Sequence, residues 1–183
     1  MSYERITDDP VFDGAIRDNH ESRYKIASGF IERNNIVVDF GCGIGYGENI
    51  LCKDGMNTSY IGLDKSIVKE THWEVDLQDA EGMKFAVPSY YDVAVCFEVI
   101  EHLSKITILV NSLKKANSYI ILSTPIIPTK HRNEFHVRDF TPDDIITLFK
   151  DEEWGLYQWF KQQAADGTDE VYGLFIFKRI KNG

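Results

Sequence analysis

The feature that most constrains the fold is a short apolar run that ends in an acid and a series of glycines. Residues 36–40 carry three β-branched side chains, then Asp39 and a phenylalanine, and glycines follow at positions 41, 43, 45 and 47. A β-branched run of this length is typical of a buried strand. Glycine adopts left-handed backbone conformations and leaves room for a ligand beside the main chain. The pattern predicts a strand that leads into a ligand-binding loop.

The size of the chain indicates one domain. Its 183 residues suit a single α/β domain, and a hydrophobic content of 43% is sufficient for a core. We expect one domain over 1–183. It comprises an N-terminal segment and helix over 1–32, which is a candidate lid, and an α/β core over 36–183.

Charge and cysteine content indicate which kinds of partner and which cellular compartment to expect. A formal net charge of -9 disfavours a broad phosphate-binding surface, so we expect no nucleic-acid partner. The first residues lack the pattern of a signal peptide, and no apolar run is long enough to span a bilayer. The three cysteines, at 42, 52 and 96, show no metal-ligand spacing. These features predict a reduced, cytoplasmic protein without membrane association.

Strand-like and helix-like segments alternate along the chain. Apolar runs predict strands over 36–40, 59–64, 72–75, 91–97 and 118–123. Helical spacing predicts helices over 20–32, 46–53 and 103–115. Asp18 or Asn19 is the expected cap of the first helix, after an irregular segment over 1–18. The alternation predicts an open, mostly parallel sheet with helices on both faces and a ligand outside the carboxyl ends of its strands.

The last third of the chain has its own signals. Thr141-Pro142 followed by two acids is a strong helix start. Two aromatic-rich runs, 154–161 and 171–179, flank Asp166-Gly167 and predict an antiparallel hairpin.

One connection is too short for this architecture. Only seven residues separate Asp64 from His72, whereas a crossover between parallel strands normally takes ten or more. We expect the helix between the second and third strands to be shortened or missing.

The glycine spacing and Asp39 bear on the kind of ligand. A pyrophosphate-binding loop reads Gly-x-Gly-x-x-Gly. Here the third position holds Tyr46 in one frame and Glu48 in the other. Asp39 would repel a pyrophosphate but attract a ligand with an ammonium and a sulfonium, such as S-adenosylmethionine. Asp64 suits ribose hydroxyls in either class of cofactor, so it does not discriminate between them.

Four motifs in order resemble the class I S-adenosylmethionine-dependent methyltransferases. They are Val38-Asp39-Phe40-Gly41-Cys42-Gly43-x-Gly45, Phe97-Glu98-Val99-Ile100-Glu101-His102-Leu103, Ser123-Thr124-Pro125 and Asn133-x-Phe135-His136-x-x-Asp139-Phe140-Thr141-Pro142. The resemblance covers about residues 20–150. It is greatest to the branch that includes methyltransferases of quinone biosynthesis and of polysaccharide gene clusters.

This resemblance implies a Rossmann-like, mostly parallel seven-stranded sheet with a C-terminal antiparallel hairpin. It also implies S-adenosyl-L-methionine as cofactor and a set of residues that bind it. Those residues are Asp39, Gly41, Cys42, Gly43, Gly45, Asp64, Lys65, Asp76, Leu77, Glu98 and Val99. Within the set, Asp39 and the glycine backbones hold the methionine end, Asp64 the ribose and Asp76 the adenine. The short connection after Asp64 affects the adenine pocket more than the glycine loop.

The acceptor side is less defined. A general base is needed only if the acceptor is a hydroxyl or a protonated amine. His102 is the first candidate and His136 the second, each against a purely structural role. His20 and Tyr24 on the first helix are further candidates for contact with the substrate, although Tyr24 equally fits the core. Glu101 fits a helix-start acid. We expect no metal, because the spacing of His131, Asn133, Glu134 and His136 matches no familiar site.

Three function classes follow from these observations. The leading one is a methyltransferase acting on a small-molecule or glycan acceptor. The second is a non-catalytic S-adenosylmethionine-binding module, and the third is an enzyme that cleaves S-adenosylmethionine without an acceptor. The aromatic residues of 154–161 fit a core or the surface of a homodimer.

Overall fold

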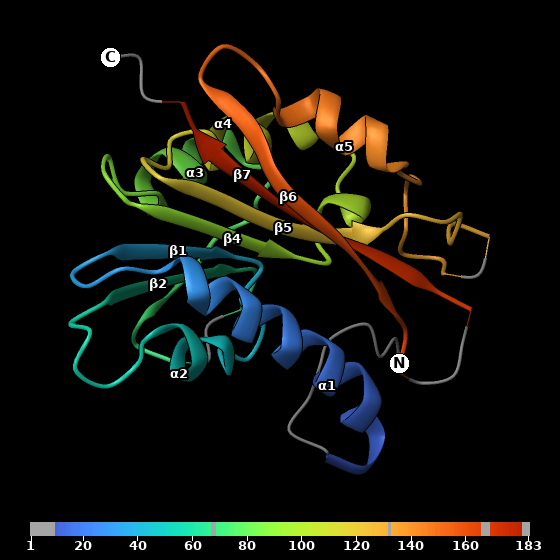
Figure 1. The fold of residues 1–183 in the computed structure, drawn as a ribbon, viewed down its shortest axis with the longest axis horizontal. Helices are drawn as coiled ribbons and strands as arrows, with labels where there is room; N and C mark the ends of the chain where they lie inside the picture. Colours follow the sequence, from blue (N-terminus) through green and yellow to red (C-terminus); the bar gives the residue numbers. More distant parts are fainter. Residues whose placement is uncertain (1–9, 67–68, 132, 166–168, 181–183) are drawn as a thin grey trace.

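The computed structural model describes residues 10–66, 69–131, 133–165 and 169–180. These residues form a seven-stranded sheet in the order β3-β2-β1-β4-β5-β7-β6 (Figure 1). The strands are β1 (Ile36–Phe40), β2 (Ser59–Asp64), β3 (His72–Glu74), β4 (Val93–Phe97), β5 (Tyr119–Pro125), β6 (Trp154–Gln163) and β7 (Val171–Arg179). Strands β1 to β5 pair in parallel, and β7 runs antiparallel to both β5 and β6. The expected fold class is confirmed.

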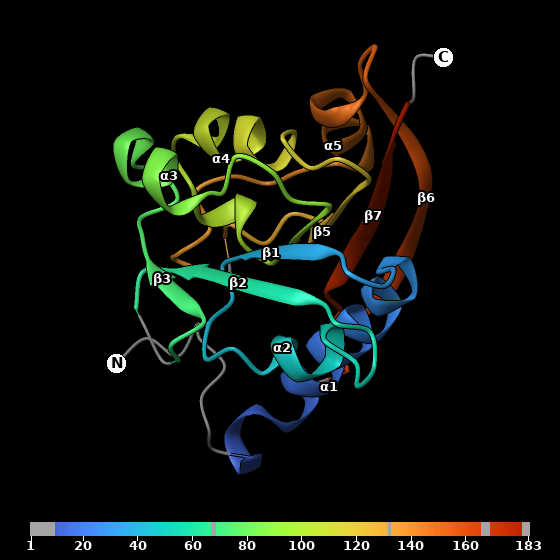
Figure 2. The same ribbon diagram turned by 90° about the vertical axis from the view of Figure 1, so that its left-hand side faces the viewer.

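Helices cover both faces of the sheet (Figure 2). On one face lie α1 (Pro10–Ala27) and α2 (Gly47–Leu51), and on the other lie α3 (Ala80–Ala86), α4 (Ile106–Leu113) and α5 (Pro142–Phe149). Two 3₁₀ turns, η1 (Ser28–Phe30) and η2 (Ile100–His102), complete the elements. No helix in the described part of the chain is long and apolar enough to cross a membrane.

The central strands carry two cores because their side chains alternate between the faces. In β4, Val93, Val95 and Phe97 pack under α1 and α2, whereas Ala94 and Cys96 pack under the other three helices. All five side chains are buried. A strand that is buried on both faces reads as a continuous apolar run, which is why this strand was recognisable in the sequence.

Helix boundaries were predicted less well than strands. The first helix begins at Pro10, ten residues before its expected start, so Asp18 and Asn19 lie inside α1 and are not its caps. Proline is favoured at the first helical position, and Pro10 was the signal for this start. Helix α3 was not predicted; its cap is Asp79, whose carboxylate accepts hydrogen bonds from Glu81 N and Gly82 N. The Asp166-Gly167 turn lies outside the described residues.

The connection between β2 and β3 has no helix in its described residues, 65–66 and 69–71. Strand β3 nevertheless pairs in parallel with β2, with Gly62 opposite His72. The shortened connection that the sequence predicted is therefore present, and β3 forms one edge of the sheet.

Candidate functional site

The candidate site lies where the order of the strands reverses. From β1 the chain proceeds outward to β2 and β3, and it then returns to β4 on the opposite side of β1. Loops diverge at such a switch point, so a crevice opens outside the carboxyl ends of the strands. The glycine loop follows β1, Asp64 ends β2 and Glu98 follows β4. The sheet thus brings these three predicted segments to one edge.

The glycine loop is packed on most sides but open at one residue. Gly41, Gly43 and Gly45 have φ values of 82°, 56° and 76°, which side-chain-bearing residues rarely adopt. A Cβ at Gly41 would overlap Val99, and one at Gly45 would overlap His72, whereas a Cβ at Gly43 would meet no atom within 4 Å. Gly43 is therefore the point where a ligand can reach the main chain.

Asp39 lies buried beneath this loop. The hydroxyls of Tyr24 and Tyr60 both donate to its Oδ2, each at 2.8 Å. Its Oδ1 has no hydrogen-bond partner among the residues that the structure describes. Burial raises the pKa of Asp39 to about 6, and the two tyrosine hydrogen bonds oppose that shift. Tyr24 is itself buried, so it belongs to the core and at the same time holds the site acid.

Asp64 and Cys42 shape the loop from the side of β2. The Asp64 carboxylate accepts a hydrogen bond from Gly43 N at 2.9 Å, so this acid orients the main chain of the open glycine. Cys42 is buried, and a Cβ at Gly62 would lie 2.7 Å from its sulfur. The thiol therefore packs closely against β2.

Lys69 of the short connection and His72 at the start of β3 support the glycine loop, and neither was among the predicted site residues. The ammonium of Lys69 donates to Gly45 O at 2.8 Å and lies 3.2 Å from the Glu48 carboxylate. The His72 ring fills the space beside Gly45. Burial lowers the pKa of His72, and the nearby Lys69 adds to that effect. The short connection between β2 and β3 was the available signal for these two residues. With no helix described there, residues of this segment lie against the glycine loop.

The predicted adenine side is more open. Asp76 is exposed, accepts a hydrogen bond from Gln78 N at 2.9 Å and lies 3.6 Å from the ammonium of Lys65. Leu77 is buried next to it. Asp76 and Lys65 thus pair with each other at the rim of the candidate site. Asp39 and Asp64 are buried inside it.

Glu98 joins the site to α1. It has a φ of 54°, an uncommon value for a residue other than glycine. Its Oε1 accepts a hydrogen bond from Ser123 Oγ at 2.6 Å and lies 3.2 Å from Arg23 Nη1. Burial raises the pKa of Glu98, although Arg23 and Ser123 oppose that shift. His20, one turn before Arg23, has its pKa lowered to about 3 by burial and by the Arg23 charge.

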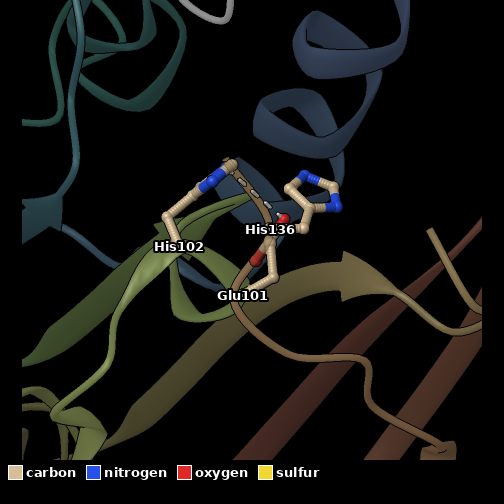
Figure 3. A group of neighbouring side chains, drawn as sticks. All are labelled: Glu101, His102 and His136. Carbon is tan, nitrogen blue, oxygen red and sulfur yellow. Dashed lines mark ion pairs between the residues drawn. The ribbon is translucent and has the colours of Figure 1, made fainter. Parts of the chain in front are cut away.

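Glu101, His102 and His136 form a cluster next to Glu98 (Figure 3). Glu101 lies in the first turn of η2, as expected of a helix-start acid, but it is also buried, and its Oε2 accepts a hydrogen bond from Thr124 Oγ1 at 3.0 Å. Burial and the neighbouring Glu98 raise the pKa of Glu101 well above its usual range. The His102 and His136 rings meet edge to face, with centroids 4.7 Å apart.

Hydrogen bonds fix the proton positions on both rings. Nδ1 of His102 lies 3.2 Å from the Phe135 carbonyl, which can only accept, so Nδ1 carries the proton. Asn133 Oδ1 accepts from Phe135 N, so the Asn133 amide nitrogen faces Nε2 of His136 at 3.0 Å. Nδ1 of His136 then donates to Thr129 Oγ1 at 2.6 Å. Burial, with His102 nearby, lowers the pKa of His136 to about 4.

Comparisons with known proteins agree with this architecture. The family model described as "Methyltransferase domain" matches residues 15–163. No curated protein matches the chain at a significant level.

Several solved structures share the fold at low identity. The putative methyltransferase in a complex with the Haloferax volcanii Trm112 methyltransferase activator has 14% identity and a TM-score of 0.69, over 92% of this chain and 94% of that chain. Magnesium protoporphyrin IX methyltransferase from Synechocystis PCC 6803, with bound SAM, has 16% identity and a TM-score of 0.66, over 96% and 86%. N-methyltransferase NodS from Bradyrhizobium japonicum WM9, in complex with S-adenosyl-l-homocysteine, has 15% identity and a TM-score of 0.59, over 90% and 86%.

The match of the family model extends from within α1 to the end of β6, and it therefore includes the glycine loop, Asp64, Glu98 and the histidine cluster. The chain belongs to the family of proteins that carry this methyltransferase domain.

Proposed function

We propose that this protein transfers a methyl group from S-adenosylmethionine to a small-molecule or glycan acceptor by in-line displacement. The observation that carries the proposal is the open position at Gly43, in a glycine loop at the switch point of a methyltransferase domain. The sulfonium of the cofactor supplies an activated methyl group. The protein's task is then to orient donor and acceptor, which can contribute about 7–11 kcal/mol to lowering the barrier.

The charges of the site suit such a cofactor. Asp39 Oδ1 is a buried acceptor without a described partner, and it suits the ammonium of the methionine end. Asp64 suits the ribose hydroxyls, while Asp76, Lys65 and Leu77 form the rim beside the adenine. Val99 lies beside Gly41 of the glycine loop, and Glu98 precedes it after β4; both suit the part of the site where the methyl group would be presented.

The acceptor would approach over the histidine cluster. His102 is partly exposed and His136 is buried, so His102 is the better placed of the two to meet an acceptor. His136 is held at both ring nitrogens, which favours a positioning role. The predicted branch, with its quinone or polysaccharide acceptors, and a cytoplasmic location remain parts of this proposal.

Calorimetric titration with S-adenosylhomocysteine tests the cofactor site. We expect saturable binding, and at least a tenfold loss of affinity in Gly43→Val, because a β-branched side chain would fill the open position and strain the backbone. Gly55→Val is the matched control, since Gly55 also has a positive φ, of 78°, and a Cβ there also meets no atom within 4 Å, but the residue lies outside the glycine loop. Absence of binding to the unchanged protein would refute the proposal.

Product analysis separates the three function classes. Incubation with S-adenosylmethionine and a panel of phenolic, amine and sugar acceptors should yield S-adenosylhomocysteine only when an acceptor is present. Binding without turnover over the whole panel would favour the non-catalytic module. Methylthioadenosine or homoserine derivatives formed without an acceptor would favour cleavage of the cofactor.

A further inference from the structure

The cluster of Glu101, His102 and His136 has a composition that methyl transfer alone does not require. Each side chain offers one ligand atom, and the three atoms lie within 4.8 Å of one another. They come from two segments far apart in sequence, η2 and the loop before α5 (Figure 3). One carboxylate and two imidazoles form a donor set typical of zinc and of other first-row divalent metals.

Buried Glu101 gives the second observation. Its Oε2 is bonded to Thr124, but its Oε1 is buried and has no hydrogen-bond partner among the described residues. The same Oε1 lies 4.0 Å from Nε2 of His102. A buried carboxylate oxygen in this situation is costly unless a cation or a donor meets it. The unsatisfied atom points to a ligand between the two side chains.

His102 is oriented as a metal-ligating histidine commonly is. Nδ1 of His102 is bonded to the Phe135 carbonyl, which leaves the lone pair on Nε2, the atom that faces Glu101. A ring nitrogen bonded to a backbone carbonyl is the usual outer partner of a ligating histidine. The His136 ring is bonded to Thr129 and Asn133, and an ion would take the place of one of these partners.

The ligand atoms are somewhat wider apart than in a formed site. Ligand atoms bound at about 2.0–2.2 Å in tetrahedral geometry lie about 3.3–3.6 Å apart. The Glu101 and His102 atoms are 4.0 Å apart, and the three atoms of the cluster lie within 4.8 Å of one another. The loop that carries His136 is tied to η2, since Val137 N donates to Glu101 O at 2.9 Å. A small movement of side chains is sufficient to close the set.

We propose that Glu101, His102 and His136 bind a divalent metal ion of the zinc, cobalt or manganese type, which binds an oxygen of the methyl acceptor. This departs from the sequence-based expectation of no metal, and its catalytic part rests on the proposed function. An acceptor hydroxyl on the ion would release its proton to water, because a bound divalent cation lowers the pKa of a hydroxyl. An oxygen lone pair then forms the bond to the methyl carbon, and the electron pair of the broken carbon–sulfur bond stays on sulfur as a thioether.

Metal titration of the whole protein, freed of metal by chelation, tests the site directly. We expect one Zn²⁺ to bind per chain, and Co²⁺ to give visible absorption bands that Zn²⁺ abolishes. Glu101→Gln, His102→Gln and His136→Gln should each weaken Zn²⁺ binding at least tenfold. Glu101→Gln preserves the shape of the side chain and an acceptor for Thr124, and S-adenosylhomocysteine titration with circular dichroism establishes that each variant is folded.

His131→Gln is the matched control, because this exposed histidine lies in the same loop but outside the cluster. It should bind Zn²⁺ like the unchanged protein. Equal Zn²⁺ affinity in the three cluster variants and the unchanged protein would overturn the metal site, as would no binding at all. If turnover survives chelation but is lost in His102→Gln, the metal site is overturned, and the result indicates that the His102 imidazole acts as a general base without a metal. Metal binding without S-adenosylhomocysteine binding would instead refute the proposed function alone.

Discussion

Arg23 on α1 and Glu98 after β4 form an ion pair in which Nη1 and Oε1 lie 3.2 Å apart. The Arg23 side chain is only 1% exposed. It also donates from Nε to Gln162 at 2.6 Å, and its guanidinium lies 4.3 Å from the centre of the Tyr172 ring. One side chain therefore joins α1, β6 and β7 to the residue that follows the central strand. Through Glu98, the N-terminal helix is coupled to the candidate site.

Replacement of Arg23 by leucine should destabilise the protein strongly. The substitution leaves Glu98 buried without its cation, and loss of one partner of a buried pair typically costs about 3–5 kcal/mol. We expect the free energy of unfolding, measured by urea denaturation, to fall by about this amount. Arg17→Leu is the control on the same helix, since Arg17 pairs with Glu21 at 3.5 Å with both side chains 32% exposed. That change should cost less than about 1 kcal/mol. Equal effects of the two substitutions would contradict this account.

Asp39 should make stability depend on pH in the direction opposite to that of a surface carboxylate. Burial raises its pKa to about 6 in the folded protein, against an ordinary value of 3.8. Between these values the folded state binds more protons than the unfolded state, so the free energy of unfolding falls as pH rises. The total loss on going from pH 4 to pH 7 is about 2 kcal/mol.

Asp39→Asn separates this effect from the other titrating groups. The amide does not titrate, and its oxygen can still accept from Tyr24 and Tyr60. The free energy of unfolding of the unchanged protein minus that of Asp39→Asn should fall by about 2 kcal/mol between pH 4 and pH 7. A constant difference over this range would show that Asp39 has an ordinary pKa.

The sequence predicted strands better than helices for a physical reason. Strands β1 and β2 have the predicted bounds. Strand β1 is buried along most of its length and is a largely apolar run, which makes such a strand recognisable. Helix α1 was placed ten residues late, although Val11, Phe12, Ala15 and Ile16 at its start have helical spacing. The residues of the candidate site also differ in how well the sequence predicted them. Motifs within a single segment, such as the glycine loop, were visible in the sequence.

Contacts between distant segments were not predictable from the sequence. Glu101 and His136 are 35 positions apart, and no local pattern indicates that a carboxylate buried beside Thr124 would face a histidine from the next loop. The same holds for Lys69, whose bond to Gly45 depends on how the short connection folds back over the glycine loop. Three-dimensional proximity of this kind depends on the sheet order.

Lys69→Met should weaken cofactor binding more than it weakens the fold. Lys69 and its partner Glu48 are partly exposed, so the ion pair contributes less than about 1 kcal/mol to stability. The bond to Gly45 O orients the glycine loop, and its loss should raise the dissociation constant for S-adenosylhomocysteine by about three- to tenfold, or about 0.7–1.4 kcal/mol. Lys114→Met, which removes a pair with Asp151 at 2.7 Å outside the candidate site, should leave the affinity unchanged. Similar affinities for all three proteins would exclude a role for Lys69 in the site.

Gly45→Ala tests whether His72 limits the space beside the loop. A Cβ at Gly45 would overlap the His72 ring, and the residue has a φ of 76°. Left-handed strain of about 1–2 kcal/mol and overpacking of about 1–3 kcal/mol should together lower the free energy of unfolding by about 2–5 kcal/mol. Gly55→Ala isolates the strain, because Gly55 has a φ of 78° and open space around it. In a His72→Ala background, Gly45→Ala should cost no more than Gly55→Ala does. If the cost of Gly45→Ala is the same with and without His72, backbone conformation alone requires the glycine.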